Sequence, residues 1–208
     1  MLSRLLTARS VPLRLAAIVL ALALLSTDSR AQAGHQHHDH GAGLPPVTLP
    51  AGSIVTEADV RFMQGMIAHH AQAVVMSRMA AARGASPRVL KLAQKIDLAQ
   101  AGEIALMQDW LRGYGQFAPD TSSWRGMTMP GMLTAGDLAQ MDASSGRDFD
   151  RLFLRLMIRH HEGALSMVAD LLKTARAAQE VDINVFANDV ETTQTAEIGL
   201  MRQMLLEY

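Results

Sequence analysis

The second half of this 208-residue sequence repeats the first half, and the repeated unit is too small to bury an apolar face by itself. Residues 59–76 align with residues 150–167, and residues 93–111 align with residues 187–205. The first alignment pairs Asp59/Asp150, Phe62/Phe153, Met66/Met157, Ile67/Ile158, His69/His160, His70/His161, Ala73/Ala164 and Met76/Met167. The second pairs Ala93/Ala187, Gln100/Gln194, Glu103/Glu197, Ile104/Ile198, Leu106/Leu200, Met107/Met201 and Leu111/Leu205. Such a repeat predicts two copies of one supersecondary unit packed against each other.

Each copy is predicted to be a hairpin of two helices. Apolar residues recur at helical spacing in four segments, and no segment alternates with the period of a strand. The predicted helices cover residues 57–83, 87–112, 145–178 and 181–206. The sequence therefore predicts an all-α fold, a four-helix bundle of two tandem hairpins (residues 57–112 and 145–208) related by an approximate two-fold axis.

Capping residues mark where the predicted helices begin. The pairs are Thr56 with Asp59, Ser86 with Pro87, Thr134 with Asp137, and Ser145 with Asp148. The pair at Thr134 predicts one short helix inside the connection between the hairpins, residues 113–144. This connection also carries the methionine-containing segment MTMPGM.

Residues 1–33 have the organisation of a secretory signal peptide. Three arginines precede the apolar run LAAIVLALALL, and AQA then fits a signal-peptidase site, so we predict cleavage after Ala33. The apolar run is shorter than the about 20 residues that span a bilayer. We therefore expect a periplasmic or secreted protein without stable membrane insertion after cleavage.

Residues 34–56 are predicted to form a flexible tail and linker rich in glycine, proline and histidine. The run HQHHDH, from His35 to His40, is able to bind a divalent metal in any conformation, and it equally suits a solvated polar tail.

Composition narrows the classes of function. A net charge of −1 and an aromatic content of 4% provide neither a basic surface nor stacking platforms, so a nucleic acid is not expected as a partner. The chain has no cysteine, which removes disulfides and thiolate ligands, and it has 14 methionines.

Two adjacent histidines stand in the middle of each first helix, His69 with His70 and His160 with His161. At about 100° per residue, both members of a pair flank the apolar stripe of their helix. A single buried histidine is usually a core residue bound to a backbone carbonyl. Four buried imidazoles need many partners, and a metal ion supplies partners while it keeps the rings neutral. We predict these four residues as metal ligands, serving one site or two.

Four methionines lie on the same helix faces as the histidines and are predicted thioether ligands: Met66, Met76, Met157 and Met167. Methionine at helical spacing is commonly core filler, and Met107 and Met201 are assigned to packing. The loop methionines Met127, Met129 and Met132 follow no helical period. They form either a soft-metal ligand set or a lid packed over the bundle.

Imidazole and thioether donors without thiolate favour copper, most clearly Cu(I). Zinc sites more often include cysteine or a carboxylate, and calcium and magnesium prefer oxygen. A ferritin-type di-iron site uses Glu-x-x-His motifs, and no glutamate lies three residues before any of the four histidines. Glu103 and Glu197 remain available as ligands or as acceptors for the ring N–H groups.

The paired histidines, the phrase MIRHHEGALSM, the MPGM linker and the doubled hairpin resemble bacterial secreted proteins of the domain-of-unknown-function family number 305. The resemblance covers about residues 55–207. It implies a ferritin-like helical bundle, a periplasmic location and copper tolerance, since the family includes the copper-binding CopM proteins. The positions that carry the motif here are His69, His70, His160, His161, Met66, Met76, Met157 and Met167.

The expected function is periplasmic copper sequestration or handling without catalytic turnover, with a copper-transport protein as the partner that exchanges the metal. One alternative is a non-haem di-metal oxidoreductase that uses the histidines with Glu103 and Glu197. Another is a structural or partner-binding bundle whose histidines are packed without metal. The sequence contains no motif that supports another enzyme class.

Overall fold

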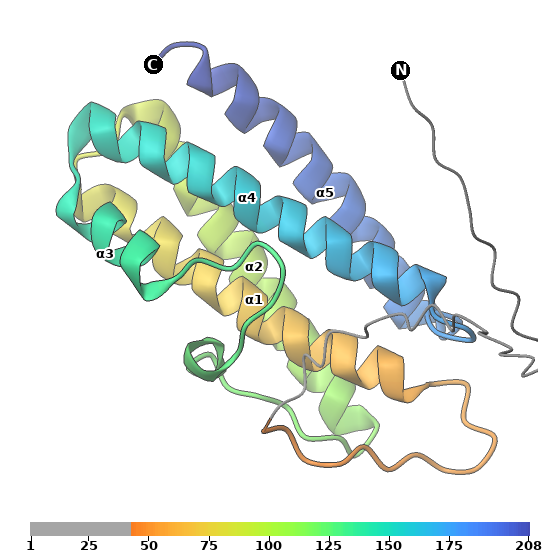
Figure 1. The fold of residues 1–208 in the computed structure, drawn as a ribbon. Helices are drawn as coiled ribbons and strands as arrows, with labels where there is room; N and C mark the ends of the chain where they lie inside the picture. Colours follow the sequence, from red (N-terminus) through yellow and green to blue (C-terminus); the bar gives the residue numbers. More distant parts are fainter. Residues whose placement is uncertain (1–42) are drawn as a thin grey trace, which may run out of the picture. The chain divides into compact units, whose positions relative to one another are not determined.

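The computed structural model describes residues 43–208 (Figure 1). Its helices are α1 (Glu57–Ala82), α2 (Pro87–Gly113), the short 3-10 helix η1 (Ser123–Gly126), α3 (Ala135–Ala143), α4 (Gly146–Lys173) and α5 (Val181–Leu205). No strand occurs in this part of the chain, which confirms the predicted all-α fold. None of the helices described has the length and apolarity to cross a membrane. The predicted signal peptide and the His35–His40 run lie outside the described residues.

The four long helices form two hairpins that pack along α1 and α4 (Figure 1). α1 pairs with α2, and α4 pairs with α5. α2 and α5 meet through side chains: Nε1 of Trp110 donates to Glu180 at 3.1 Å near one end, and Arg88 pairs with Glu207 near the other. These contacts make α2 antiparallel to α5. The predicted bundle of two tandem hairpins is confirmed.

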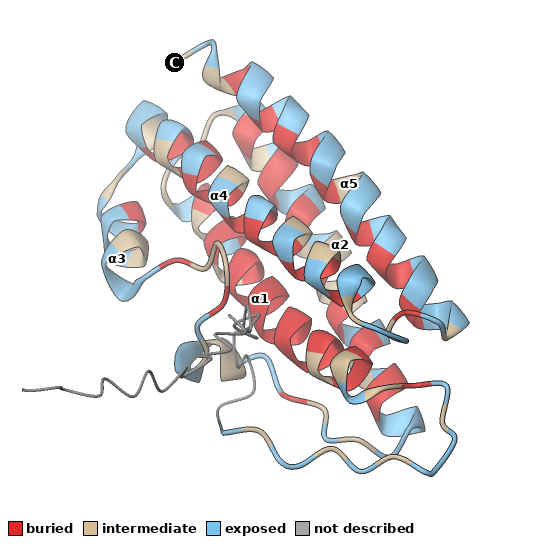
Figure 2. Ribbon diagram, turned by 45° about the vertical axis from the view of Figure 1, so that its right-hand side comes forward, coloured by how far each residue is buried: buried red, intermediate tan, exposed pale blue. Residues whose placement is uncertain are grey.

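Two apolar clusters fill most of the interior of the bundle. Figure 2 marks the buried residues in red on all four long helices. One cluster includes Phe62 from the beginning of α1 and Phe186 from the beginning of α5, whose ring centroids lie 6.3 Å apart. The other includes Ala80 near the end of α1 and Phe149 near the beginning of α4. Because the hairpins run in opposite directions, each cluster takes residues from both hairpins.

The structure corrects one predicted helix end. α4 ends at Lys173 rather than at residue 178. Arg176 and Ala178 then adopt φ values of 67° and 54°, in the left-handed region that L-residues rarely occupy. The backbone N–H of Ala178 donates to Oδ1 of Asp59 at 2.7 Å, so a carboxylate from α1 stabilises the turn.

Three of the four predicted helix starts carry their capping hydrogen bonds: Thr56 with Asp59, Ser86 before Pro87, and Thr134 with Asp137. At the fourth, α4 begins at Gly146 as expected, but the predicted capping bond is not formed, because the Ser145 side chain accepts no hydrogen bond from the helix. Asp148 instead contacts Arg151 at 3.1 Å, and Gly146 begins the helix with a left-handed φ of 54°.

Candidate metal centre

The four predicted histidine ligands lie in the middle of α1 and α4 and have no exposed surface. His69 and His160 face each other where the hairpins meet, with ring centroids 3.8 Å apart and ring planes inclined by 40°. They are equivalent residues of the repeat. Since each contacts its own equivalent, the approximate two-fold axis passes between the two rings.

The outer histidines each bind a glutamate of their own hairpin. Nε2 of His70 lies 2.7 Å from Oε2 of Glu103 on α2, and Nε2 of His161 lies 2.9 Å from Oε2 of Glu197 on α5. When such a ring is neutral, the Nε2–H donates to the carboxylate and Nδ1 keeps its lone pair. The two glutamates therefore set the ring orientation and the tautomer in both repeats.

Glu197 sits in a more enclosed position than its counterpart. Its side chain is 5% exposed, against 25% for Glu103. Burial raises the pKa of Glu197, but the hydrogen bond and charge of His161, followed by Lys95 at 3.3 Å, lower it by more in sum. The pKa of Glu197 consequently lies below its ordinary value, and the carboxylate is ionised at neutral pH.

Several ring nitrogens in this centre have no hydrogen-bond partner among the described residues. They are Nδ1 of His70, Nδ1 of His161 and both ring nitrogens of His160. Burial lowers the pKa of His160 well below its ordinary value, and charges on His69, His161 and His70 lower it further. A backbone contact with His69 opposes the shift, but it does not have hydrogen-bond geometry. His160 is thus held neutral with lone-pair capacity, as a metal ligand requires.

These side chains belong to a polar layer that separates the two apolar clusters on all four long helices. The layer contains His69, His70, Gln100, Glu103, His160, His161, Gln194 and Glu197. Oε1 of Gln100 and Oε1 of Gln194, which are equivalent in the repeat, also have no partner among the described residues. Polar atoms left unpaired in a core usually indicate a water, an ion or a ligand.

Residues 127–133, here called the strap, cross α1 and α4 (Figure 1), with Pro130 and Gly131 packed against Gly163 of α4. The strap contacts His69, which with His160 is here called the axial histidine pair. Nε2 of His69 lies 3.1 Å from the carbonyl oxygen of Pro130. Gln72 holds the end of the strap: its amide donates to the Leu133 carbonyl at 3.0 Å and accepts from the Leu133 N–H at 2.7 Å. The strap therefore encloses the histidine centre from one side.

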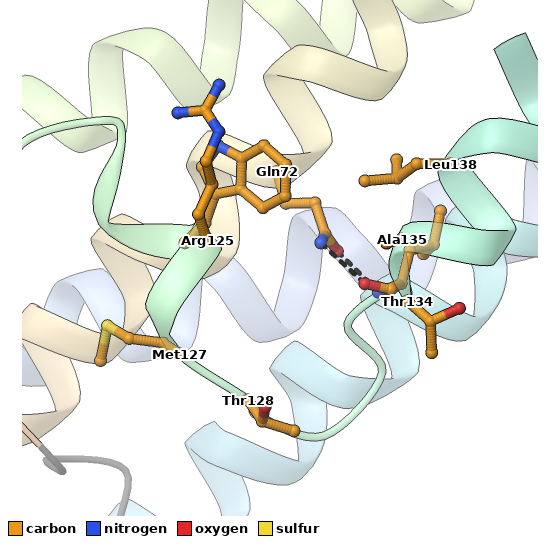
Figure 3. A pocket seen from close by; sticks show the side chains of 9 residues that line it. Gln72, Arg125, Met127, Thr128, Thr134, Ala135 and Leu138 are labelled. Carbon is orange, nitrogen blue, oxygen red and sulfur yellow. Dashed lines mark hydrogen bonds between the residues drawn. The ribbon is translucent and has the colours of Figure 1, made fainter.

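The strap also borders a cavity of 510 Å³ between η1 and α3 (Figure 3). Gln72, Trp124, Arg125, Met127, Thr128 and Leu138 are among its lining residues. In Figure 3 the side chain of Gln72 reaches toward this space, and its two bonds to the strap are drawn as dashed lines. The strap thus packs against α4 and also borders free volume between α1, η1 and α3.

Replacing Gly163 with alanine is expected to lower the free energy of unfolding by about 1–3 kcal/mol, because overpacking displaces the strap. A Cβ on Gly163 would overlap the Pro130 carbonyl and lie 2.7 Å from Cα of Gly131. Denaturant unfolding measures the loss, and faster amide exchange at Leu133 reports the displaced strap. The control is Gly102→Ala, an exposed helical position with open space, which should gain about 0.5–1 kcal/mol. Equal effects of the two substitutions would contradict this packing.

The four predicted methionine ligands are buried, but they divide between the two apolar clusters. Met66 and Met167 belong to one cluster, and Met76 and Met157 belong to the other. The polar layer lies between these pairs. Each side of the histidine centre therefore offers two of the predicted thioethers.

The structure brings together some of the predicted ligands and keeps others apart. His69 and His160 are in contact, whereas His70 and His161 lie on the flanks, with ring centroids 6.5 and 6.4 Å from those of their neighbours. Among residues 43–208, no group of three or more His, Cys, Asp or Glu side chains is arranged to hold a metal ion.

Met129 and Gly65 complete the strap side of the centre. The sequence left open whether Met129 is a soft-metal ligand or part of a lid over the bundle. In the structure its side chain is 5% exposed and lies beside Gly65 of α1. Gly65 carries no motif of its own. The sequence distinguishes Gly65 only through the repeat: it aligns with Leu156, so the first copy has glycine at a position where the second copy has a large apolar residue.

Solved structures with similar folds include two proteins of one family. A DUF305 protein from Streptomyces coelicolor is 29% identical, with a TM-score of 0.64 over 72% of this chain and 93% of that chain. A DUF305 fragment from Deinococcus radiodurans is 30% identical, with a TM-score of 0.65 over 74% of this chain and 99% of that chain. No curated protein matches the chain.

A further similar structure is CopM in its Cu(I)-bound form, which is 28% identical with a TM-score of 0.58 over 72% of this chain and 96% of that chain. CopM has also been crystallised with Cu(II) and with silver. The family model described as the domain of unknown function DUF305 matches residues 59–205, which is most of the sequence. The chain therefore belongs to the DUF305 family.

Proposed function

We propose that this protein binds copper in the polar layer of its bundle and sequesters it or passes it on, without catalytic turnover. The observation that carries the proposal is the set of buried ring nitrogens without partners on His70, His160 and His161. A buried polar group left unpaired costs about 1–3 kcal/mol, so this arrangement is costly unless something binds it. A metal ion offers a partner to neutral imidazole.

The donor types favour copper over other metals. The proposed ligands are His69, His70, His160 and His161 with Met66, Met76, Met157 and Met167, all of them buried. Thioethers of the two apolar clusters flank the histidines on both sides of the polar layer. Imidazole with thioether suits copper, and thioether suits Cu(I) in particular. The similarity to CopM, solved with Cu(I), Cu(II) and silver, supports the same assignment.

The proposed location is the periplasm or the cell exterior. The sequence pattern of residues 1–33 supports export, with cleavage after Ala33. The Streptomyces coelicolor relative is likewise named as a secreted protein. In that compartment, a copper-transport protein is the proposed partner that delivers or receives the metal.

The test is copper titration of residues 34–208 in a background where His35, His37, His38 and His40 are alanine. The chain has eight histidines, so this background leaves only the four of the centre. Adding His69→Gln and His160→Gln is expected to weaken copper binding at least about 100-fold, a loss of about 2.7 kcal/mol. The measurement is competition with a chromophoric chelator, for Cu(II) in air and for Cu(I) without oxygen.

The matched control is Met107→Leu with Met201→Leu, two buried packing positions that are equivalent in the repeat. This pair should leave copper affinity unchanged. Copper at 100 times its dissociation constant should also stabilise the background protein by about 2.7 kcal/mol. Equal copper binding with and without the axial histidines would refute the proposed centre.

A further inference from the structure

We propose that Met129 of the strap joins Met167 of α4, one of the thioether ligands proposed above, in a subsite beside Gly65 that binds a soft monovalent cation, Cu(I) or Ag(I), without a histidine ligand. This subsite rests on the proposed function in one respect, since it would exchange its ion with the histidine centre. It lies on one side of the polar layer only. The second repeat has no equivalent subsite.

Gly65 makes the room in which the two thioethers meet. A methyl group placed on Gly65 would lie 3.2 Å from Sδ of Met129 and 3.4 Å from Cε of Met167. Both side chains thus approach the same point on the surface of α1, Met129 with its sulfur and Met167 with its terminal methyl group. Each methionine is 5% exposed. Methionine side chains are flexible, so both residues can turn their sulfur atoms toward one ion in this buried space beside Gly65.

The repeat shows that this arrangement is not a by-product of the duplication. The counterpart of Met167 is Met76, and the counterpart of Gly65 is Leu156, which is buried in the same apolar cluster as Met76. A large apolar side chain therefore occupies the equivalent position in the other half. The strap occurs once in the chain, so Met129 has no counterpart at all.

The subsite lies close to the histidine centre. Gly65 and His69 are four residues apart and share one face of α1. Met129 directly precedes Pro130, whose carbonyl oxygen lies 3.1 Å from Nε2 of His69. Because Gly65 and His69 are four residues apart, an ion beside Gly65 would lie about one helical turn, about 6 Å along α1, from His69.

The chemistry selects the kind of ion. Thioethers are neutral, soft donors, and they prefer Cu(I) to Zn(II), Ca(II) or Mg(II). Burial among apolar residues adds to this preference, because a monovalent ion loses less hydration energy than a divalent one when it leaves water. The cavity of 510 Å³ beside Met127 and Thr128 leaves free volume next to the strap (Figure 3).

The experiment titrates Ag(I), which has no accessible redox partner under these conditions, into residues 34–208 with the four tail histidines replaced by alanine. Met129→Leu removes one sulfur and nearly conserves volume, so the fold should persist. It is expected to weaken Ag(I) binding about tenfold or more and to change Cu(II) binding less than about twofold. Met132→Leu, in the same strap, is the control and should leave Ag(I) binding unchanged.

A second measurement follows the methionine methyl resonances during the Ag(I) titration. The signals assigned to Met129 and Met167 should shift first, and Gly65→Ala should weaken Ag(I) binding by crowding both side chains. If Ag(I) binding survives Met129→Leu but is lost with His69→Gln and His160→Gln, the subsite is refuted and the histidine centre stands. If Met129→Leu abolishes Ag(I) binding while the histidine variant binds Cu(II) normally, the subsite stands and the proposed copper centre fails.

Discussion

Replacing Asp150 with alanine is expected to lower the free energy of unfolding by about 3–5 kcal/mol, as measured by denaturant unfolding, since charge-assisted hydrogen bonds are lost and a donor is left buried. The carboxylate of Asp150 is 1% exposed. It accepts from the Ser86 N–H at 3.1 and 3.2 Å and from the Tyr208 hydroxyl at 2.6 Å. Alanine leaves the Ser86 N–H without this acceptor and removes one of the contacts that hold Tyr208 to α4.

The matched control is Asp148→Ala, two residues earlier on the exposed side of α4. Asp148 makes a surface ion pair with Arg151 at 3.1 Å, and such pairs contribute about 0–1 kcal/mol. Comparing the two variants therefore distinguishes the effect of a buried carboxylate from the effect of a surface charge on the same helix. A similar small loss for both variants would show that Asp150 does not anchor the α1–α2 connection.

Asp59, at the beginning of α1, holds the connection of the second hairpin in the way that Asp150 holds the connection of the first. It accepts from the Ala178 N–H at 2.7 Å and thereby fixes the connection between α4 and α5. Each hairpin thus uses an aspartate at the beginning of its first helix to hold the turn of the other hairpin. This exchange couples the hairpins and explains why the aligned pair Asp59 and Asp150 is buried in both copies.

Local sequence patterns predicted what depends on local geometry. The period of apolar residues located the four long helices, and the capping residues Thr56 and Ser86 marked the beginning of α1 and α2, because both signals act within one or two helical turns. The end of α4 was mispredicted since its cause is distant in sequence: the turn at Ala178 is stabilised by Asp59, from the first repeat. A helix pattern contains no information about such a partner.

The repeat also predicted that the histidine pairs belong to one interior. It could not predict that His69 and His160 would face each other while His70 and His161 turn to Glu103 and Glu197, because that division depends on the packing angle between the hairpins. The strap was the least predictable part. Its position depends on Gly163 and Gln72, which are aligned positions of different size in the two copies.

Acidification below about pH 6.5 is expected to lower the free energy of unfolding of the metal-free protein by about 1.4 kcal/mol per pH unit through His160 alone. Burial, with charges on His69, His161 and His70, holds the pKa of His160 well below 6.5 in the folded state. Above pH 6.5 the ring is neutral in both states. Below it, the unfolded chain binds a proton that the folded protein does not, so stability falls with pH until the depressed pKa is reached.

The measurement is urea unfolding at half-unit steps from pH 7.5 to 5, with His160→Gln as the comparison. Replacing the ring should reduce the slope of the free energy of unfolding against pH by the contribution of one proton, because glutamine does not titrate. With copper bound, the free energy of unfolding should depend less on pH at the beginning of the acidification. At lower pH the copper should be released, since protons and metal compete for the imidazole nitrogens. An unchanged slope in His160→Gln, or stability that rises on acidification, would show that the ring is not held neutral. The lone pairs proposed to bind copper would then be protonated at the pH where the protein folds.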